Sequence, residues 1–285
     1  SADHIGLGGI DSMEQMAKVK QVVPETVFNH GYAILNADDD LVYAMKEGLK
    51  CNIAYFSMDE NNPRIKKHCK AGGYAAVFEN GYITIMKGTW KIRVIKVSEV
   101  PVTYGGKALH NVMNCLPAVL STYFWRDIEI EDIKLALQTF VPSSAQTPGR
   151  LNMFQFKHFQ FLVDFAHNPA GLELLCDFIS KLDGEPKVGI ISGTGDRRDE
   201  DIKELGRISG RSFDEIIIRQ DKNLRGRTAE EIVNLLVEGI NETKTKDIPI
   251  EIIYNEKEAI MHAYNNAKPG SLITIMCDVV AEALD

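Results

Sequence analysis

Three side chains that could bind a ligand or move a proton lie close together in the segment FLVDFAHNPAG, residues 161–171. Asp164 supplies a carboxylate, His167 an imidazole and Asn168 a carboxamide. The apolar residues before Asp164 predict a buried strand, and Pro169 suits the first turn of a helix, where its missing N–H costs nothing. In open parallel sheets ligands bind beyond the carboxyl ends of the strands, so this turn is a candidate site. Asp and Asn are also common helix caps, and these residues alone fit a structural role equally well.

Two further loops rich in charge follow apolar, strand-like runs. The run KVGIIS (187–192) leads into SGTGDRRDED (192–201), and DEIIIR (214–219) leads into RQDKNLRGR (219–227). Each loop alone is also typical of a solvated surface with salt bridges. Together, on one edge of one sheet, the loops favour a site for an anionic ligand. Four arginines would bind it: Arg197, Arg198, Arg225 and Arg227.

The elements that must position these loops are those of an α/β protein. From about residue 147 onward, apolar runs alternate with amphipathic helices, which predicts a mainly parallel sheet covered on both faces, as in a Rossmann-like domain. The first half holds apolar runs at 31–40 and 52–60, an alternating segment with the turns ENGY and KGTW, and a helical segment near 110–125. These features predict a mixed sheet with helices. We therefore expect two domains, residues 1–146 and 147–285.

The composition narrows the class of protein. The chain of 285 residues is 45% hydrophobic and 25% charged, and its net charge of −8 argues against non-specific nucleic-acid binding. It contains no apolar run of the roughly 18–20 residues that cross a membrane. Its five cysteines form no C-x-x-C pair, which predicts reduced thiols in a cytoplasmic protein rather than a disulfide framework or a zinc site.

DFAHNP resembles the motif D-[YG]-A-H-[NT]-P of the Mur ligases and folylpolyglutamate synthetases. Other segments resemble motifs of these families in the same order: DHIGLGG with MEQMAKVK near the start, LNADD at 35–39, GGKALHNVMN at 105–114 and TPGRLN at 147–152. Within the superfamily, DHIGLGGIDSMEQMAKVKQVV, SGTGDRRDEDI and DKNLRGR are similar to the cyanophycin synthetase subfamily. The resemblance is to the C-terminal, Mur-ligase-like region of that subfamily and covers essentially the whole chain.

The resemblance implies an ATP-dependent amide ligase, in which ATP phosphorylates a carboxylate and an amine attacks the acyl phosphate. ATP and Mg²⁺ are the implied cofactors, since Mg²⁺ bridges phosphates and offsets the charge of the transferred group. The implied substrates are arginine and the aspartate side-chain carboxylates of a polyaspartate acceptor. Alternatives are a folylpolyglutamate- or Mur-type ligase with another substrate, or a non-catalytic nucleotide-binding domain. A dinucleotide-binding domain is disfavoured because no G-x-G-x-x-G follows the strand-like run at 160–164.

The resemblance assigns metal and adenine contacts to the first half. His4 and Lys20 would hold Mg²⁺, with Lys20 matching a lysine that is carbamylated in the family. Lys18 is the alternative if the register of this helix differs. Asn111 and Asn114, at the start of a helix, would contact adenine.

The resemblance assigns catalytic and substrate contacts to the second half. Arg150 and His167 would act in catalysis with Lys20, and Arg150, Asp164 and Asn168 would contact the nucleotide. The substrate-binding residues would be Asp196, Arg197, Arg198, Asp221, Arg225 and Arg227. A guanidinium prefers carboxylate partners, so the acids of these loops (Asp196, Asp199, Glu200 and Asp221) suit arginine, and the sequence leaves open which of them binds it.

The chain departs from the family at one point: no G-x-x-x-x-G-K-[ST] phosphate loop occurs in it. The resemblance therefore implies a truncated Mur-ligase central domain, followed by the Rossmann-like C-terminal domain, with the missing N-terminal regions of the same enzyme as partner. We expect the chain alone to form no amides. An unpaired strand edge left by such a truncation favours self-association, so homo-oligomers are an alternative to a monomer.

Overall fold

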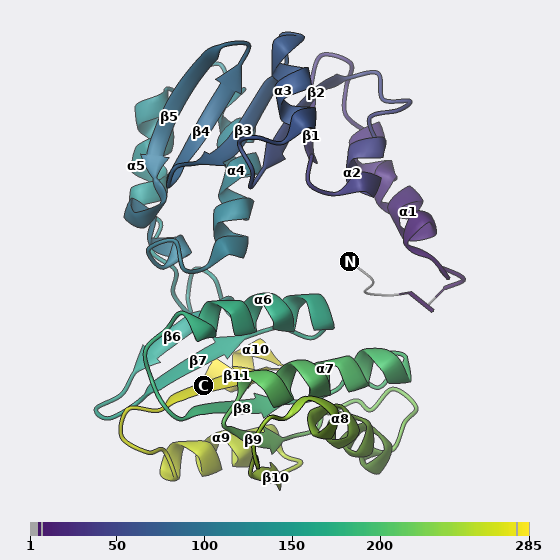
Figure 1. Cartoon of the computed structure of the whole chain (residues 1–285), viewed down its shortest axis with the longest axis vertical. Coiled ribbons are helices and arrows are strands. Elements are labelled where there is room, and N and C mark those ends of the chain that lie inside the picture. Colours follow the sequence, from purple (N-terminus) through teal and green to yellow (C-terminus); the bar gives the residue numbers. More distant parts are fainter. Residues whose placement is uncertain (1–4, 7, 278, 285) are drawn as a thin grey trace. The chain divides into compact units, whose positions relative to one another are not determined.

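The computed structural model describes residues 5–6, 8–277 and 279–284. The chain forms two compact units, Ser1–Val141 and Pro142–Asp285, so their boundary lies a few residues before the junction expected at 146/147 (Figure 1). Among the described residues, no helix combines the length and the apolar character needed to cross a membrane.

The first unit is built on a mixed five-stranded sheet in the order β1-β2-β3-β4-β5. Strands β1 to β3 are parallel, and β3, β4 and β5 form the predicted antiparallel meander. Asn80 and Gly81 join β3 to β4 with φ angles of 49° and 83°, the left-handed conformations that a two-residue hairpin turn requires. The elements are α1 (Met13–Glu25), β1 (Tyr32–Asn36), α2 (Asp40–Ala44), β2 (Asn52–Ser57), α3 (Pro63–Lys70), β3 (Tyr74–Glu79), β4 (Tyr82–Lys87), β5 (Trp90–Lys96), the 3₁₀ turns η1 (Val97–Glu99) and η2 (Pro101–Thr103), α4 (Leu109–Tyr123) and α5 (Ile130–Thr139).

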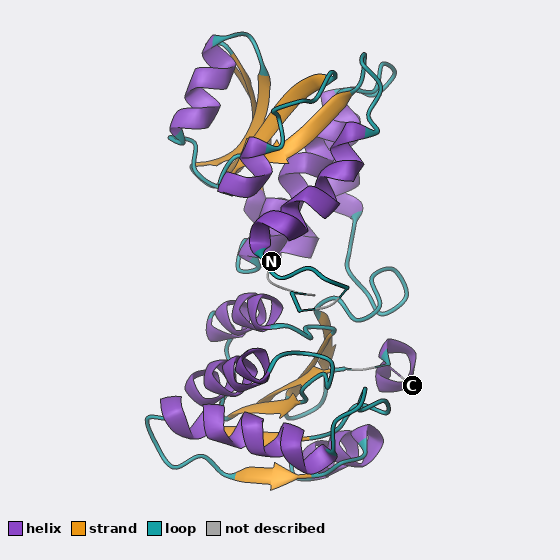
Figure 2. Cartoon of the chain, turned by 90° about the vertical axis from the view of Figure 1, so that its right-hand side faces the viewer, coloured by secondary structure: helices purple, strands orange, loops and turns teal. Residues whose placement is uncertain are grey.

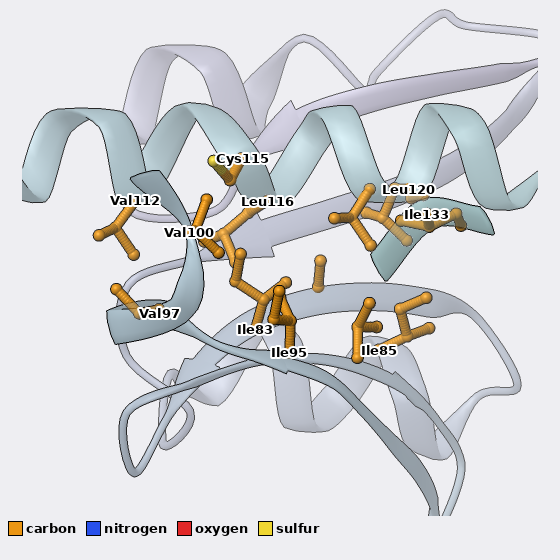
Figure 3. Close-up of a cluster of buried hydrophobic side chains, with 14 residues drawn as sticks. Ile83, Ile85, Ile95, Val97, Val100, Val112, Cys115, Leu116, Leu120 and Ile133 are labelled. Atoms are coloured by element: carbon orange, nitrogen blue, oxygen red, sulfur yellow. The ribbon is translucent and has the colours of Figure 1, made fainter. Parts of the chain in front are cut away.

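A hydrophobic core between this sheet and α4 and α5 fixes the start of α4. Ile83 and Ile85 of β4 are fully buried against Leu116 of α4 and the neighbouring apolar side chains (Figure 3). The buried hydroxyl of Thr103 lies 2.8 Å from the carbonyl oxygens of Val97 and Val100, so it anchors the loop that leads into α4. The first two turns of α4, which carry the predicted adenine residues Asn111 and Asn114, are therefore held by a packed scaffold.

The second unit is built on a six-stranded sheet in the order β10-β9-β8-β11-β7-β6. All its strands are parallel except β6, which pairs antiparallel with β7 at one edge and has no counterpart in the sequence prediction. Helices α6, α7 and α8 cover one face, and α9 and α10 cover the other (Figures 1 and 2). The elements are β6 (Asn152–Gln155), β7 (Gln160–Asp164), α6 (Pro169–Ser180), β8 (Lys187–Ile191), α7 (Asp199–Ser212), β9 (Glu215–Ile218), α8 (Ala229–Thr243), β10 (Ile250–Ile252), α9 (Glu256–Asn265), β11 (Leu272–Met276) and α10 (Val280–Leu284).

The helices of this unit start where local chemistry predicts. Asn168 caps α6 by accepting the Gly171 N–H, and Pro169 occupies the first helical position. Thr228 and Glu231 form the predicted capping box of α8, in which each side chain accepts the backbone N–H of the other residue. These caps fix the first residues of α6 and α8, and with them the ends of the loops that precede these two helices.

Helices α7 and α8 are in very close contact because glycines remove side chains from their interface. A Cβ atom added at Gly239 of α8 would lie 2.0 Å from the carbonyl oxygen of Lys203 of α7, and one at Gly206 would lie 2.2 Å from the carbonyl oxygen of Leu236. Real Cβ atoms do not approach backbone oxygens this closely, so any side chain here would push the helices apart. The loops before α7 and α8 are brought together by this contact.

We predict that Gly239→Ala lowers the free energy of unfolding by about 1–3 kcal/mol, because the added methyl group overpacks a backbone contact. Chemical denaturation would measure the change. Asn241→Ala, at an exposed position of the same helix, is the matched control and should cost little or nothing. Equal stabilities of the two variants would contradict the packing argument.

Candidate functional site

Parallel pairing in the second unit places the predicted loops at one edge of the sheet. Strands β7, β8 and β9 run in the same direction, so their carboxyl ends, and the loops that begin there, share that edge. The turn at 164–168 follows β7, the loop 192–198 follows β8 and the loop 219–227 follows β9. The sequence expectation that these three loops gather at one edge is therefore met.

The turn that carries Arg150 is fixed by its neighbours. The side chain of Asn152 accepts the N–H of Gly149 at 2.7 Å and donates to the carbonyl of Thr147 at 2.9 Å. Leu151 adopts a left-handed conformation with φ of 49°, which is uncommon for a branched apolar residue. Its N–H donates to Oδ2 of Asp164 at 2.9 Å. The backbone on both sides of Arg150 is thus held in one conformation.

Asp164 is mostly buried at the end of β7. Burial raises the pKa of its carboxyl group, and the Leu151 N–H and the nearby Arg150 guanidinium only partly offset this effect. The guanidinium carbon of Arg150 lies 5.6 Å from the centre of the Phe165 ring. The carboxylate therefore has a structural partner in the turn, and its contact with a nucleotide stays a prediction.

His167 and Asn168 complete the turn. Nδ1 of His167 lies 3.0 Å from the carbonyl oxygen of Phe165. Since a carbonyl can only accept, this contact places the proton of a neutral ring on Nδ1 and leaves Nε2 with a lone pair. Asn168 is engaged as the cap of α6, which confirms its helix-cap reading. The predicted roles of both residues toward a ligand stay untested.

The loops after β8 and β9 are interlocked. A Cβ atom at Gly195 would lie 2.0 Å from the carbonyl oxygen of Leu224, so the two backbones touch there. Arg227 donates to the carbonyl oxygens of Gly195 at 2.9 Å and Arg197 at 2.8 Å, and it pairs with Asp199 at 2.7 Å. The two loops are therefore held together by direct contacts, and we call residues 192–201 and 219–227 the interlocked loops.

The arginines predicted to bind a substrate are engaged by groups of these loops. Nη1 of Arg225 lies 2.7 Å from Oδ2 of Asp196, while Arg198 binds both carboxylate oxygens of Asp201 at 2.8 Å. Arg197 is 8% exposed, and its Nη1 lies 3.5 Å from Oδ1 of Asp196. Burial alone would raise the pKa of Asp196, but Arg225 and Arg197 outweigh it and hold the pKa below its usual value. A substrate group would have to exchange with these internal pairs.

Arg219 was missed as a candidate by the sequence analysis. It follows β9 and is 1% exposed, and its guanidinium pairs with Asp221 at 2.9 Å and Glu256 at 3.0 Å. Asp221, one of the predicted substrate residues, is thereby nearly buried, with 9% of its side chain exposed. The sequence IIIRQD could have indicated Arg219 as a candidate, because a charged residue there directly follows three isoleucines of a buried strand.

In the first unit, Asn111 and Asn114 line one pocket of about 320 Å³. Most of its other lining residues are apolar, from α4, α5 and the loop before α4: Val102, Cys115, Ala118, Val119, Thr122, Ile133, Ala136, Leu137 and Phe140. Nδ2 of Asn111 donates to the carbonyl of Val102 at 2.8 Å, which fixes the orientation of this amide. The pocket thus places both predicted adenine residues on one apolar cavity.

The predicted metal residues are not brought together in the described part of the chain. His4 lies outside the described residues. Lys18 and Lys20 both lie exposed on α1, so exposure does not distinguish the two registers. Within residues 5–6, 8–277 and 279–284, no group of three His, Cys, Asp or Glu side chains is arranged to hold a metal ion.

We predict that Asp164→Asn raises thermal stability near pH 7. The folded-state pKa of Asp164 lies above its ordinary value of 3.8, so ionisation costs stability as pH rises through that pKa, while below about pH 3.8 both side chains are neutral. The amide oxygen of asparagine can still accept the Leu151 N–H. The melting-temperature difference between variant and parent should therefore grow from about pH 4 to about pH 7.

Asp247→Asn is the control for this pH series, because that side chain is fully exposed and should show no such trend. A parent chain that is more stable than Asp164→Asn near pH 7 would show that partners of the carboxylate outweigh its burial.

Comparisons with known proteins cover the whole chain. Residues 149–278 match the Mur ligase, glutamate ligase domain. The chain is 42% identical over 285 residues to cyanophycin synthetase of Synechocystis sp. and 44% identical over 284 residues to that of Crocosphaera subtropica. Each match covers 100% of this chain and 32% of the relative, so the chain spans about a third of their length. The fold is similar to Escherichia coli FolC in complex with DHPP and ADP, with a TM-score of 0.63 and 13% identity over 96% of this chain and 55% of that one.

Residues 149–278 are therefore similar to the Mur ligase, glutamate ligase domain, and the whole chain is similar to about a third of the length of cyanophycin synthetases.

Proposed function

We propose that this chain is part of an ATP-dependent amide ligase that attaches arginine to aspartate side-chain carboxylates of a polyaspartate backbone. The observation that carries this proposal is the similarity of the whole chain, at 42–44% identity, to proteins named cyanophycin synthetase. Since the chain spans about a third of those relatives, the reaction is assigned to the longer protein and not to these residues alone. In this proposal the protein works in the cytoplasm, where its free cysteines stay reduced.

The pocket of the first unit supports a role for ATP. Asparagine side chains can pair with both a donor and an acceptor on the edge of adenine, and Asn111 and Asn114 supply two amides at an otherwise apolar cavity. A cavity of about 320 Å³ has room for a purine ring between apolar walls. We therefore assign adenine to this pocket. From the motifs alone, we also propose Arg150, Asp164 and Asn168 as nucleotide contacts.

The described residues do not form a ligand set for Mg²⁺, so no step is assigned to the metal. When bound, Mg²⁺ would offset the negative charge of the phosphates. Lys20, carbamylated as in the family, would act as a carboxylate-like support for it, together with His4. This assignment rests on the motif alone.

The reaction proceeds in two steps. The γ-phosphoryl group of ATP passes to an oxygen of the aspartate carboxylate, which forms an acyl phosphate and ADP. The amino group of arginine then attacks the acyl carbon, phosphate leaves with its electron pair, and the amide forms with loss of a proton from nitrogen. Nε2 of His167 carries the lone pair that could accept that proton, since Nδ1 contacts a carbonyl.

The interlocked loops supply charges of both signs for two charged substrates. The carboxylates of Asp196 and Asp221 suit the guanidinium of arginine, and Arg197, Arg198, Arg225 and Arg227 suit the acidic acceptor. Because most of these groups are already paired with one another, a substrate contact replaces an internal one, except at Asp221, whose carboxylate is held by the buried Arg219. This exchange favours substrates that carry the same two groups, a guanidinium and carboxylates.

We predict that the longer protein releases phosphate from ATP when given arginine and an aspartate polymer. The 285-residue chain, which lacks a phosphate loop, should show neither ATP hydrolysis nor amide formation. Phosphate release and incorporation of labelled arginine would measure both activities. Turnover with folate and glutamate, or with nucleotide-linked peptides, would instead assign another Mur-type substrate. ATP binding by the longer protein without any amide product would assign a non-catalytic nucleotide-binding role.

A second prediction separates the two lysine registers. In the longer protein, Lys20→Ala should reduce ligation by about 10–100-fold, because it removes the support of the metal. Lys18→Ala, a change at another exposed position of α1, should stay within about twofold of the parent. The measurement is the rate of arginine-dependent phosphate release by each variant. Equal rates for the two variants would reject the assignment of Lys20 as the metal support.

A further inference from the structure

Arg219 is a buried cation at the carboxyl edge of the second sheet. Its side chain is 1% exposed, and the apolar strand β9 precedes it. A buried guanidinium costs free energy unless opposite charges and hydrogen-bond acceptors surround it. Here Asp221 and Glu256 supply two carboxylates, and Gln220 and Met276 supply carbonyl oxygens. The fold thus surrounds this charge with two carboxylates and two carbonyl oxygens, and the contact of its Nε with Glu256 is an ion pair rather than a hydrogen bond.

These contacts join the ends of different strands. The Arg219 N–H donates to the carbonyl of Ile191, the last residue of β8, at 2.9 Å. Its Nη2 donates to the carbonyl of Met276, the last residue of β11. Its Nε lies 3.0 Å from Oε2 of Glu256, the first residue of α9, which follows β10. Arg219, the residue that follows β9, therefore contacts the last residues of β8 and β11 and the first residue of α9, the helix that follows β10.

The peptide group between Met276 and Cys277 also links Arg219 to the end of β7. The carbonyl of Met276 accepts from Arg219, and the N–H of the same peptide group, on Cys277, donates to the backbone carbonyl of Asp164 at 2.9 Å. A displacement of the Arg219 guanidinium would therefore change the position of the loop 219–227 relative to the DFAHNP turn. It would also act directly on Asp221, because Nη1 of Arg219 holds its carboxylate at 2.9 Å.

We infer that Arg219 is a positioning residue for the incoming amino acid: it fixes Asp221 and the loop 219–227 relative to the turn after β7. This inference rests on the proposed function, in which that loop contacts arginine. The planar guanidinium has five donor N–H groups in a rigid fork, and here it serves several acceptors from different segments. A lysine at this position keeps the charge but cannot reach these acceptors at once.

Arg207 offers a matched comparison in the same unit. It also pairs with several carboxylates, those of Glu200, Glu204 and Glu242, but it lies along α7 and joins that helix to α8. Loss of either arginine removes a guanidinium that pairs with several carboxylates, although the side chain of Arg207 is 21% exposed and its loss costs less stability than loss of the buried Arg219. An effect on the loop 219–227 should follow loss of Arg219.

The first arm of the experiment uses the longer protein and measures arginine-dependent phosphate release. Arg219→Lys should raise the KM for arginine by about tenfold, the result of losing one well-placed charge-assisted contact, with less than about twofold change in the KM for ATP. Arg207→Lys should leave both KM values unchanged. Glu256→Gln, a milder change at a side chain that is 15% exposed, should move the KM for arginine in the same direction as Arg219→Lys.

The second arm measures amide hydrogen exchange in the 285-residue chain, which needs no activity. Arg219→Lys or Glu256→Gln should speed exchange in residues 219–227, and Arg207→Lys should not. Unchanged exchange in this loop, or equal increases in the KM for arginine and ATP, would overturn the inference. If the parent protein shows no arginine-dependent turnover, the proposed function fails, and the exchange data still decide whether Arg219 positions the loop.

Discussion

The parallel pairing of β7, β11, β8, β9 and β10 is the constraint on which the candidate site depends. It sends the loops that follow these strands to one edge of an apolar sheet, so charged side chains gather there, some buried and some exposed to water. The buried charges are costly unless they are paired. This explains why the loops contain acids and arginines in matched pairs: Asp196 with Arg225, Asp199 with Arg227, Asp201 with Arg198 and Asp221 with Arg219.

These pairs differ in burial, and this difference indicates that they have different roles. In the pair Arg219–Asp221, 1% and 9% of the side chains are exposed, whereas in Arg225–Asp196 the values are 43% and 24%. An exposed pair contributes little free energy, so a ligand can replace one partner at small cost. Removal of one partner from a buried pair leaves an uncompensated charge. The buried pair therefore suits the support of the loops, and the exposed pair suits exchange with a substrate.

Local sequence patterns predicted most of the fold, while non-local contacts escaped them. The caps at Asn168 and Thr228 and the antiparallel meander follow from residues close in sequence. Strand β6 is short and gains its pairing from β7, so no periodicity marked it. The sequence pattern predicted that the polar loops lie at one edge of the sheet. It could not show that Arg219 contacts Met276 and Glu256, because these residues lie far from Arg219 in the sequence.

Backbone strain distinguishes the candidate site from the scaffold around it. Among the described residues, non-glycine residues with positive φ are Asn80, Tyr104, Leu151 and Arg225. Asn80 sits in a hairpin turn that requires this conformation, but the others lie in the loop before α4, the turn of Arg150 and the loop 219–227. Such conformations persist only where surrounding bonds over-determine them, as the Leu151 N–H does with Asp164. Leu151 and Arg225 lie in segments that resemble family motifs, and the strained backbone at Leu151 holds the neighbouring Arg150 backbone in one conformation.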